Sequence, residues 1–346
     1  MLRTAVVAVA VAAALLPIPT PWVERVYSSA VYPAWQSWMT TASNATPIAL
    51  LDVLIVGVGA AWAIATGIDI GRRRSCGWGH TAVRSLVRAV VWAAALYLVF
   101  LGSWGLNYRR VRLIDKLDFD GTRVSADSLR ALVTTAVGRL NALHPPAHAT
   151  GWPADLDIDP ALLPAFESAQ RDLGATRLAV PARPKHTMLN PYFRRAVVDG
   201  LTDPFFLETL VVSDLVPLER PFVVAHEWAH LAGYGDEGEA NFVGWLACMH
   251  GDEARQYSAW IFLFNEAAGL LPRPDRRDLE ERLEAGPRED VQAIAERVTR
   301  NRSTRVSEAG WRVYNQYLKA NRVESGAASY AEVIRLILGT RFSPNR

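Results

Sequence analysis

The chain has few cysteines and few charged residues. Only two cysteines occur among its 346 residues, Cys76 in an arginine-rich stretch and Cys248 in an apolar run. Their spacing predicts neither a disulfide framework nor a thiolate zinc cluster, so a bound metal would have to be held by nitrogen and oxygen. Charged residues make up 21% of the chain, below the roughly 25% of an ordinary soluble domain.

A strong net charge of either sign is also missing. The 37 basic and 35 acidic residues leave a formal charge of +2, without the positive field that attracts nucleic-acid backbones. We therefore expect no nucleic-acid partner. A length of 346 residues favours about two structural units over a single small module.

Apolar residues form 50% of the chain and are concentrated near its N-terminus. They predict three membrane spans, at about residues 4–20, 48–70 and 87–106, because each block with its flanks can cover the roughly 20 residues that cross a hydrocarbon core. The first block fits a secretory signal as well as an anchor, and we favour an uncleaved anchor. Residues 1–106 are thus predicted to be a membrane region, and residues 107–346 a globular domain.

Positive charge is unevenly distributed between the predicted spans. The connection between the second and third spans has no acidic residue and carries Arg72, Arg73, Arg74, Arg84 and Arg88. The segment 20–47, predicted to be a loop, carries only Glu24 and Arg25. By the positive-inside rule the arginine-bearing connection is cytoplasmic, which puts the 107–346 domain outside. We expect a multi-pass protein of the cell membrane, embedded in the lipid bilayer, with an extracytoplasmic domain.

The globular part is predicted to be mainly α-helical with a small β-sheet, an α+β fold. Apolar residues at helical spacing predict a helix over residues 125–143, ended by Pro145 and Pro146, and another over residues 159–173. Helical patterns resume at Pro221 and continue to the C-terminus, interrupted by a polar connection around residues 272–278.

The stretch 174–221 is rich in Pro, Gly, Val and Phe and predicts short strands and turns. Its clearest strand is residues 207–212. An edge strand beside a cleft could bind an extended peptide by main-chain pairing. An ordinary structural strand with Glu208 facing solvent is the alternative, and the sequence does not decide between the two.

The segment PFVVAHEWAHL contains His226, Glu227 and His230. Two histidines at i and i+4 lie on one face of a helix, one turn apart, and can bind one zinc ion. Glu227 projects beside them, where it can take a proton from a water molecule that zinc activates. Apolar neighbours surround these polar residues, and a metal would compensate their burial. The H-E-x-x-H spacing therefore predicts a zinc-dependent hydrolase with Glu227 as general base.

A third metal ligand is expected after this helix, because catalytic zinc sites have three protein ligands and an open position for water. Gly233 and Gly235 can turn the chain back, and Asp236, Glu237 and Glu239 follow. We favour Glu239, since the start of the next predicted helix would hold it rigidly in a gluzincin-like arrangement. Asp236 would instead complete a metzincin-like H-E-x-x-H-x-x-G-x-x-D pattern, and Glu237 is the third candidate.

Catalysis by such a site also needs a hydrogen-bond donor that stabilises the transition state. Four residues are candidates, and the sequence favours none of them: Tyr234, His250, Tyr314 and Tyr317. Asn241 is a candidate hydrogen-bond partner for a metal ligand.

Three segments together resemble a bacterial domain-of-unknown-function family of membrane-anchored, zincin-like proteins of the gluzincin type, expected to be zinc metallopeptidases. They are WGLNY at residues 104–108, H-E-x-A-H-x-x-G at 226–233, and EANF at 239–242. The C-terminal residues 313–340 are similar as well, so the likeness covers most of the chain, although residues 203–222 match only loosely. The resemblance implies a zincin-like catalytic domain, bound Zn²⁺, Glu239 as the third ligand, and a peptide or protein substrate.

The sequence thus favours a membrane-anchored zinc metallopeptidase. One alternative is a zinc amidase acting on a cell-wall cross-link, which would use the same residues. Another is a non-catalytic, membrane-tethered binding module with a structural zinc ion. Glu227 argues against the last, because a structural site has no use for a base and normally fills its fourth position with protein. No motif indicates a cleavage preference or an oligomeric state.

Overall fold

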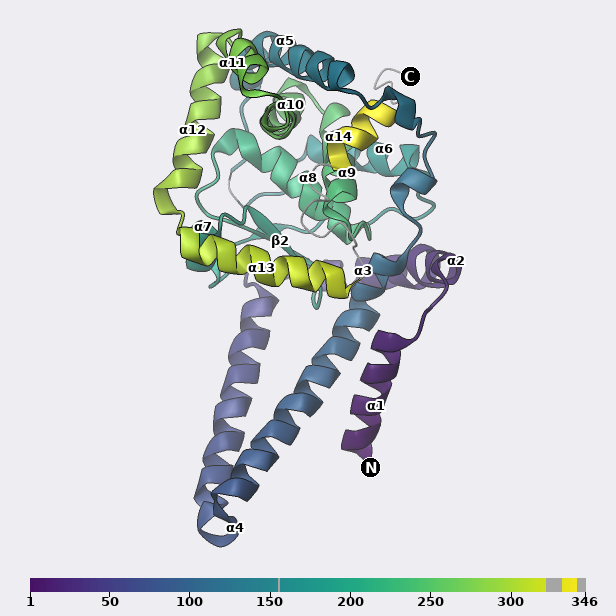
Figure 1. Ribbon diagram of the computed structural model, residues 1–346, viewed down its shortest axis with the longest axis vertical. Helices are drawn as coiled ribbons and strands as arrows, with labels where there is room; N and C mark the ends of the chain where they lie inside the picture. Colours follow the sequence, from purple (N-terminus) through teal and green to yellow (C-terminus); the bar gives the residue numbers. More distant parts are fainter. Residues whose placement is uncertain (155, 322–331, 341–346) are drawn as a thin grey trace.

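The computed structural model describes residues 1–154, 156–321 and 332–340, with the backbone alone at 73–76. The molecule is elongated, with a globular part at one end and apolar helices projecting from it (Figure 1). The expected mainly α-helical fold with a small sheet is confirmed. Part of the C-terminal segment that carries the family resemblance, residues 322–331, lies outside the described residues.

A long helical hairpin projects from the globular part (Figure 1). Helix α4, Leu50–Ser103, bends at Gly77, where φ is 76°, so that Leu50–Arg72 and Gly77–Ser103 are two candidate membrane spans. They correspond to the spans predicted at 48–70 and 87–106. The connection between these two predicted spans, residues 71–86, is shorter in the structure, because the second helix begins at Gly77, and Arg88 lies within that helix. There it pairs with Asp69 at 2.9 Å across the hairpin, which neutralises both charges.

The first apolar block forms helix α1, Leu2–Leu15, which reaches spanning length only as a pair with Thr20–Asn44, bent by 108°. The predicted loop at 20–47 is wrong. Its residues form helix α2 (Thr20–Trp22), a π-helical segment (Val23–Val31) and helix α3 (Tyr32–Asn44). Polar side chains fix α3 against the globular part: the Gln36 amide donates to the Val180 carbonyl at 2.8 Å, and the Thr40 hydroxyl to the Leu207 carbonyl at 3.0 Å.

The globular part is built around helices α8 and α9, which pack against each other, and α10 packs on both of them and on α5. The helices are α5 (Ala126–Thr150), α6 (Leu162–Asp172), α7 (Asn190–Ala196), α8 (Arg220–Leu231), α9 (Glu237–Met249), α10 (Glu253–Gly269), α11 (Arg273–Glu281), α12 (Ala285–Asn301), α13 (Thr304–Ala320) and α14 (Glu332–Gly339). Short 3₁₀ turns occupy Gly105–Arg109, Leu113–Asp115, Gly121–Arg123 and Pro217–Glu219. Helix α13 crosses the side of the globular part that faces the hairpin (Figure 1).

Two predicted helix boundaries differ from the structure. Helix α5 begins at a capping box formed by Ser125 and Ser128, but it does not end at Pro145 and Pro146 and continues to Thr150. Tertiary packing holds this last part, because Ala147 is fully buried, although an interior proline ordinarily breaks a helix at a cost of about 3 kcal/mol. The polar connection predicted around 272–278 is largely helix α11, whereas the helix predicted at 159–173 is confirmed as α6.

A three-stranded sheet lies beside α8, in the order β1 (Pro184–Lys185), β3 (Glu208–Val211), β2 (Gly200–Asp203). Strand β3 pairs parallel with β1 and antiparallel with β2, with Thr209 opposite Thr202. The strand predicted at 207–212 is confirmed. However, it is the central strand and not an edge, and β2 is the edge strand next to α8. The alternative with Glu208 on the solvent face is also wrong, since Glu208 is fully buried.

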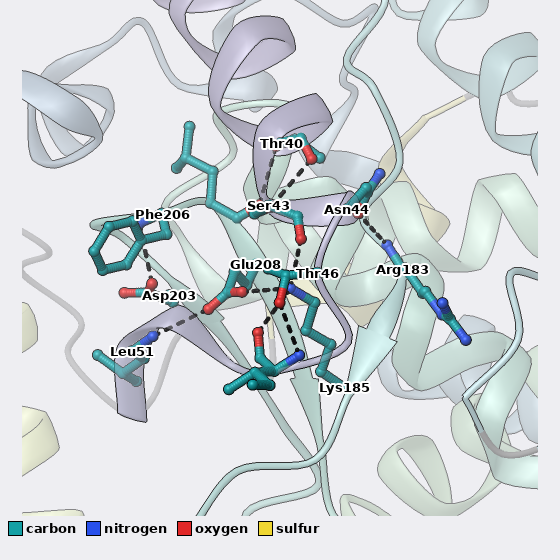
Figure 2. Close-up of polar contacts among 12 residues, drawn as sticks. Thr40, Ser43, Asn44, Thr46, Leu51, Arg183, Lys185, Asp203, Phe206 and Glu208 are labelled. Atoms are coloured by element: carbon teal, nitrogen blue, oxygen red, sulfur yellow. Dashed lines mark hydrogen bonds and ion pairs between the residues drawn. The ribbon is translucent and has the colours of Figure 1, made fainter. Parts of the chain in front are cut away.

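A buried ion pair explains the position of Glu208 and joins the sheet to the hairpin (Figure 2). Lys185 Nζ lies 2.6 Å from Glu208 Oε1, and the two side chains are 2% and 0% exposed. The ammonium group also donates to the carbonyls of Ser43 and Ile48 at 2.7 and 3.2 Å, and Glu208 Oε2 accepts from the Leu51 N–H at 3.2 Å. Residues at the start of the first hairpin helix, Leu50–Arg72, therefore pack into the globular part.

Candidate metal centre

Helix α8 places His226 and His230 one turn apart, as the sequence predicts, and their Nε2 atoms lie 3.2 Å apart. The rotation of the helix is fixed by its apolar side. Trp228 is fully buried, and its indole N–H donates to the Ala182 carbonyl at 2.8 Å. With this side in the core, the two imidazoles share the opposite side of the helix, toward α9.

Glu237, and not Glu239, reaches the two histidines. Its Oε2 lies 3.3 Å from His226 Nε2 and 3.6 Å from His230 Nε2. We call His226, His230 and Glu237 the α8 cluster; their ligand atoms all lie within 4.8 Å of one another. Tetrahedral zinc with ligands at about 2.0–2.1 Å separates its ligand atoms by about 3.3 Å. The three measured separations fit one such ion.

The start of helix α9 decides which acid faces the histidines. Asp236 caps the helix, since its carboxylate accepts from the N–H groups of the first turn at 2.9 and 3.2 Å. Glu237 is the first helical residue and points back at α8. Glu239 is two residues further, about 200° around the helix, and accepts a hydrogen bond from the Leu113 N–H instead. The structure thus brings Glu237 to the two histidines, and not Glu239, which the sequence favoured as the third ligand, while Asp236 is a helix cap.

Glu227 lies between α8 and the edge strand β2. The Thr202 hydroxyl is 2.8 Å from Glu227 Oε2 and 2.9 Å from its carbonyl oxygen. The strand comes so close that a Cβ atom on Gly200 would lie 2.5 Å from Glu227 Oε1. Burial raises the pKa of the Glu227 carboxyl, and the two histidines oppose this rise. The sequence indicated Glu227 but gave no signal for Gly200 and Thr202, because strand pairing brings them to it.

The His230 ring is oriented by the backbone that follows it. Its Nδ1 lies 2.7 Å from the Tyr234 carbonyl oxygen. A carbonyl can only accept, so Nδ1 carries a proton and Nε2 faces Glu237, as in zinc sites whose histidine donates to a carbonyl. Burial lowers the pKa of His230, but the Glu237 carboxylate raises it to about 9. Burial alone would raise the pKa of Glu237, because it disfavours the charged form here too, but the two histidines bring that pKa well below its ordinary value. The α8 cluster therefore favours a positive charge, from a proton or from a metal ion.

Aromatic residues near the membrane support the C-terminal end of α8. Trp104, at the C-terminal end of α4, donates its indole N–H to the His230 carbonyl at 2.9 Å, and the Tyr32 hydroxyl donates to the Leu231 carbonyl at 2.8 Å. Tyr108 packs edge-on against Trp104, with ring centroids 4.9 Å apart. The segment 104–108 served only as a family signature in the sequence. Its supporting role needs a contact between residues 126 positions apart.

Among the four candidate donors, Tyr314 is hydrogen-bonded to the α8 cluster. The Tyr314 hydroxyl, on α13, donates to Glu237 Oε1. Tyr317 stacks against Tyr314 with ring centroids 6.0 Å apart. Tyr234 contributes its backbone carbonyl, and His250 caps the far end of α9 and is hydrogen-bonded to Asp172.

Two buried nitrogens near the histidines have no hydrogen-bond partner in the part of the chain that the structure describes, Asn241 Nδ2 and His226 Nδ1. The structure thus shows no hydrogen bond from the amide nitrogen of Asn241 to the histidines among the described residues. The His226 side chain is 13% exposed, against 9% for His230 and 5% for Glu237. Solvent reaches the α8 cluster most readily at the His226 ring.

Comparison with known proteins gives a family and no activity. Residues 27–338 match the family described as "Protein of unknown function (DUF3810)", and the chain belongs to this family. No curated protein and no solved structure matches the chain.

Proposed function

We propose that this member of the DUF3810 family is a membrane-anchored zinc metallopeptidase that binds Zn²⁺ through His226, His230 and Glu237. The observation that carries the proposal is the spacing of the three ligand atoms, at 3.2, 3.3 and 3.6 Å, which suits a tetrahedral zinc ion. Glu227 lies in the same helix between the two histidines, as in the H-E-x-x-H metallopeptidase pattern.

Each polar side chain has a role in this chemistry. Zinc, when bound, would polarise the scissile carbonyl and lower the pKa of a water molecule. Glu227 accepts a proton from the attacking water and delivers it to the leaving nitrogen. The Thr202 hydroxyl lies 2.8 Å from Glu227 Oε2 and orients the carboxylate. The Tyr314 hydroxyl bonds to Glu237 Oε1 and fixes the rotation of that carboxylate.

The hairpin supports an extracytoplasmic position for the globular part. Its bend at Gly77, next to the arginines, lies at the end of the hairpin opposite the globular part (Figure 1). The positive-inside rule assigns that bend to the cytoplasm. A reporter that is active only outside the cytoplasm is expected to work when fused after Arg346 and to fail when inserted at Trp78. The reverse pattern would contradict this orientation.

A structural zinc site is the competing proposal, and burial favours it. The His230 and Glu237 side chains are 9% and 5% exposed, and Tyr314 covers Glu237. Against it, a structural site normally fills its fourth position with protein and needs no base. A zinc amidase acting on a cell-wall cross-link would use the same residues as a peptidase and differ only in its substrate.

Replacing Glu227 by Gln in the full chain, purified in detergent, separates these functions. We expect Glu227→Gln to keep the zinc content of the wild type and to lower hydrolysis of a peptide library by about 10²- to 10⁴-fold. Glu253→Gln, at the start of α10, is the matched control and should change neither quantity. Zinc is measured by elemental analysis, and hydrolysis by mass spectrometry.

Three outcomes would contradict the peptidase proposal. Undiminished hydrolysis by the Glu227→Gln variant would show that Glu227 is not the general base. Cleavage of peptidoglycan fragments without cleavage of peptides would favour the amidase. Zinc lost on replacement of His226 and His230, with no hydrolysis of either substrate by the wild type, would favour the structural site.

A further inference from the structure

A second pair of histidines lies one helical turn apart on α5, outside the α8 cluster. The rings of His144 and His148 have centroids 4.1 Å apart. Asp290, on α12, approaches both: its Oδ2 lies 2.8 Å from His148 Nε2 and 3.5 Å from His144 Nε2. Helices α5 and α12 meet at the end of the globular part away from the hairpin (Figure 1). We call these three residues the α5 cluster.

Close packing holds both rings in place. A Cβ atom on Gly286 would lie 2.3 Å from Cε1 of His144, so the backbone of α12 touches this ring. The His148 ring packs edge-on against Trp152 at a centroid distance of 4.9 Å. Tyr257, on α10, lies edge-on to both rings at 5.9 and 6.0 Å. Ligands fixed by packing are pre-organised for binding.

The Asp290 carboxylate can still bind a cation. The Tyr257 hydroxyl donates to Asp290 Oδ2 at 2.6 Å. An ionised carboxylate oxygen has more than one lone pair, so it can accept this proton and still contact a metal ion. The side chains of Asp290 and His148 are 13% and 38% exposed, which leaves water access to the remaining coordination positions.

We propose that the α5 cluster is a second divalent-metal site, which takes a transition metal such as Zn²⁺ and clamps α5 to α12. Two imidazoles and one carboxylate suit such ions, and the three ligand atoms lie within 4.8 Å of one another. The residues between the histidines, Pro145 to Ala147, supply no base. The cluster therefore lacks the H-E-x-x-H base of the α8 cluster, and the role we propose for its ion is limited to joining the two helices. His148 reaches Asp290 from the last turns of α5, beyond the two prolines.

The alternative without a metal is a hydrogen-bonded group. Two neutral imidazoles can each donate an Nε2–H to Asp290, and the observed 2.8 Å contact suits such a bond. A tetrahedral zinc ion would need a separation of about 3.3 Å, so His148 or Asp290 must move by a few tenths of an ångström when it binds. The two possibilities differ in whether added zinc binds here.

Calorimetric titration with Zn²⁺ tests the proposal in full-length His226→Asn/His230→Asn protein, in which the α8 cluster is removed. We expect one bound ion. Adding His144→Asn should weaken its binding by more than the roughly 100-fold that loss of a ligand's hydrogen-bond partner can cost. Adding His250→Asn is the matched control and should leave binding unchanged, because His250 belongs to neither cluster and pairs with Asp172 at 2.8 Å.

Thermal unfolding gives a second readout. Zinc is expected to raise the Tm of the His226→Asn/His230→Asn protein and to leave that of the further His144→Asn variant unchanged. If the background protein does not fold, the wild type should bind two ions and His144→Asn/His148→Asn one. Equal zinc binding with and without His144 would overturn the α5 site and leave the proposed function untouched.

Discussion

The α8 cluster and the α5 cluster use the same kinds of ligand in different surroundings. Both place two histidines one turn apart on one helix and take a carboxylate from another. The more exposed histidine side chain is 13% exposed in the α8 cluster and 38% in the α5 cluster. Electrostatic interactions are stronger where water is excluded. A cation in the α8 cluster would therefore interact more strongly with its ligands than a cation in the α5 cluster.

The tyrosines of the two clusters differ as well. Tyr314 donates to Glu237 Oε1, whereas both histidines approach Oε2. Tyr257 donates to Asp290 Oδ2, the same oxygen that both of its histidines approach. One tyrosine orients the carboxylate without competing for the binding oxygen, and the other shares that oxygen. Two clusters with the same residue types can therefore differ in binding, because they differ in whether the tyrosine and the histidines contact the same carboxylate oxygen.

The largest expected loss of stability concerns the Lys185–Glu208 ion pair, which joins the sheet beside α8 to the membrane hairpin. The α5 cluster has no such connection to the hairpin in the described residues. Lys185→Met should lower the free energy of unfolding by about 3–5 kcal/mol, because it leaves Glu208 buried without its cation. Lys185→Met/Glu208→Leu removes both charges and should recover part of the loss. Denaturant unfolding in detergent measures both variants. A cost below about 1 kcal/mol for Lys185→Met would contradict the importance of this pair.

The identity of the third ligand gives the next largest effect and tests the α8 cluster directly. In a His144→Asn/His148→Asn background, Glu237→Gln should weaken zinc binding by at least about 100-fold, or about 2.7 kcal/mol. Glu239→Gln is the matched control and should change it by less than tenfold, since Glu239 faces Leu113. Zinc titration distinguishes them, and the opposite ranking would restore the assignment made from the sequence.

A pH-dependent loss of stability is expected on the α8 side, at the end of strand β2. Burial raises the pKa of Asp203 to about 7, although the Phe205 and Phe206 N–H groups lower it. The folded state therefore binds this proton more tightly than the unfolded state, and its contribution is complete below the unfolded pKa of 3.8. The free energy of unfolding of the wild type, relative to Asp203→Asn, should fall by about 2 kcal/mol between pH 5 and 7. Parallel pH profiles in denaturant unfolding would contradict this.

The smallest effect separates the two tyrosines. With the other cluster removed in each case, Tyr314→Phe should weaken zinc binding at the α8 cluster by about tenfold, because Glu237 loses its orienting donor. Tyr257→Phe should not weaken binding at the α5 cluster, since it frees an oxygen lone pair. Zinc titration of both variants checks the difference. An equal loss at both clusters would show that the shared oxygen has no consequence.

Local patterns in the sequence located the helix with His226 and His230, both apolar helices of the hairpin and the strand at 207–212. Each depends on periodicity or on a long apolar run. They did not identify the acid that lies beside the two histidines, because Asp236, Glu237 and Glu239 have the same chemistry. The choice among them depends on where α9 begins. The end of α5 was predicted wrongly at Pro145 and Pro146 for a related reason, since packing of the residues beyond them keeps the helix intact.

Contacts distant in the sequence were not predictable. Lys185 and Glu208 each lie in a short strand with no local signal of a partner. Only the folded sheet brings them together beside Ile48 and Leu51, at the start of the first hairpin helix. The α5 cluster was not predictable from the sequence either. The prolines in HPPAH argue against a helix, and Asp290 comes from a separate helix, 142 positions away from His148.

The sequence by itself determined the apolar hairpin and the i, i+4 histidine pair with Glu227, because these depend on helical period and span length within a few turns of chain. Only the tertiary structure decided that Glu237 completes the α8 cluster, that Gly200 and Thr202 hold Glu227, and that Trp104 supports His230. Such contacts depend on how caps, strand order and helix packing orient side chains from distant segments, and short-range patterns do not specify this.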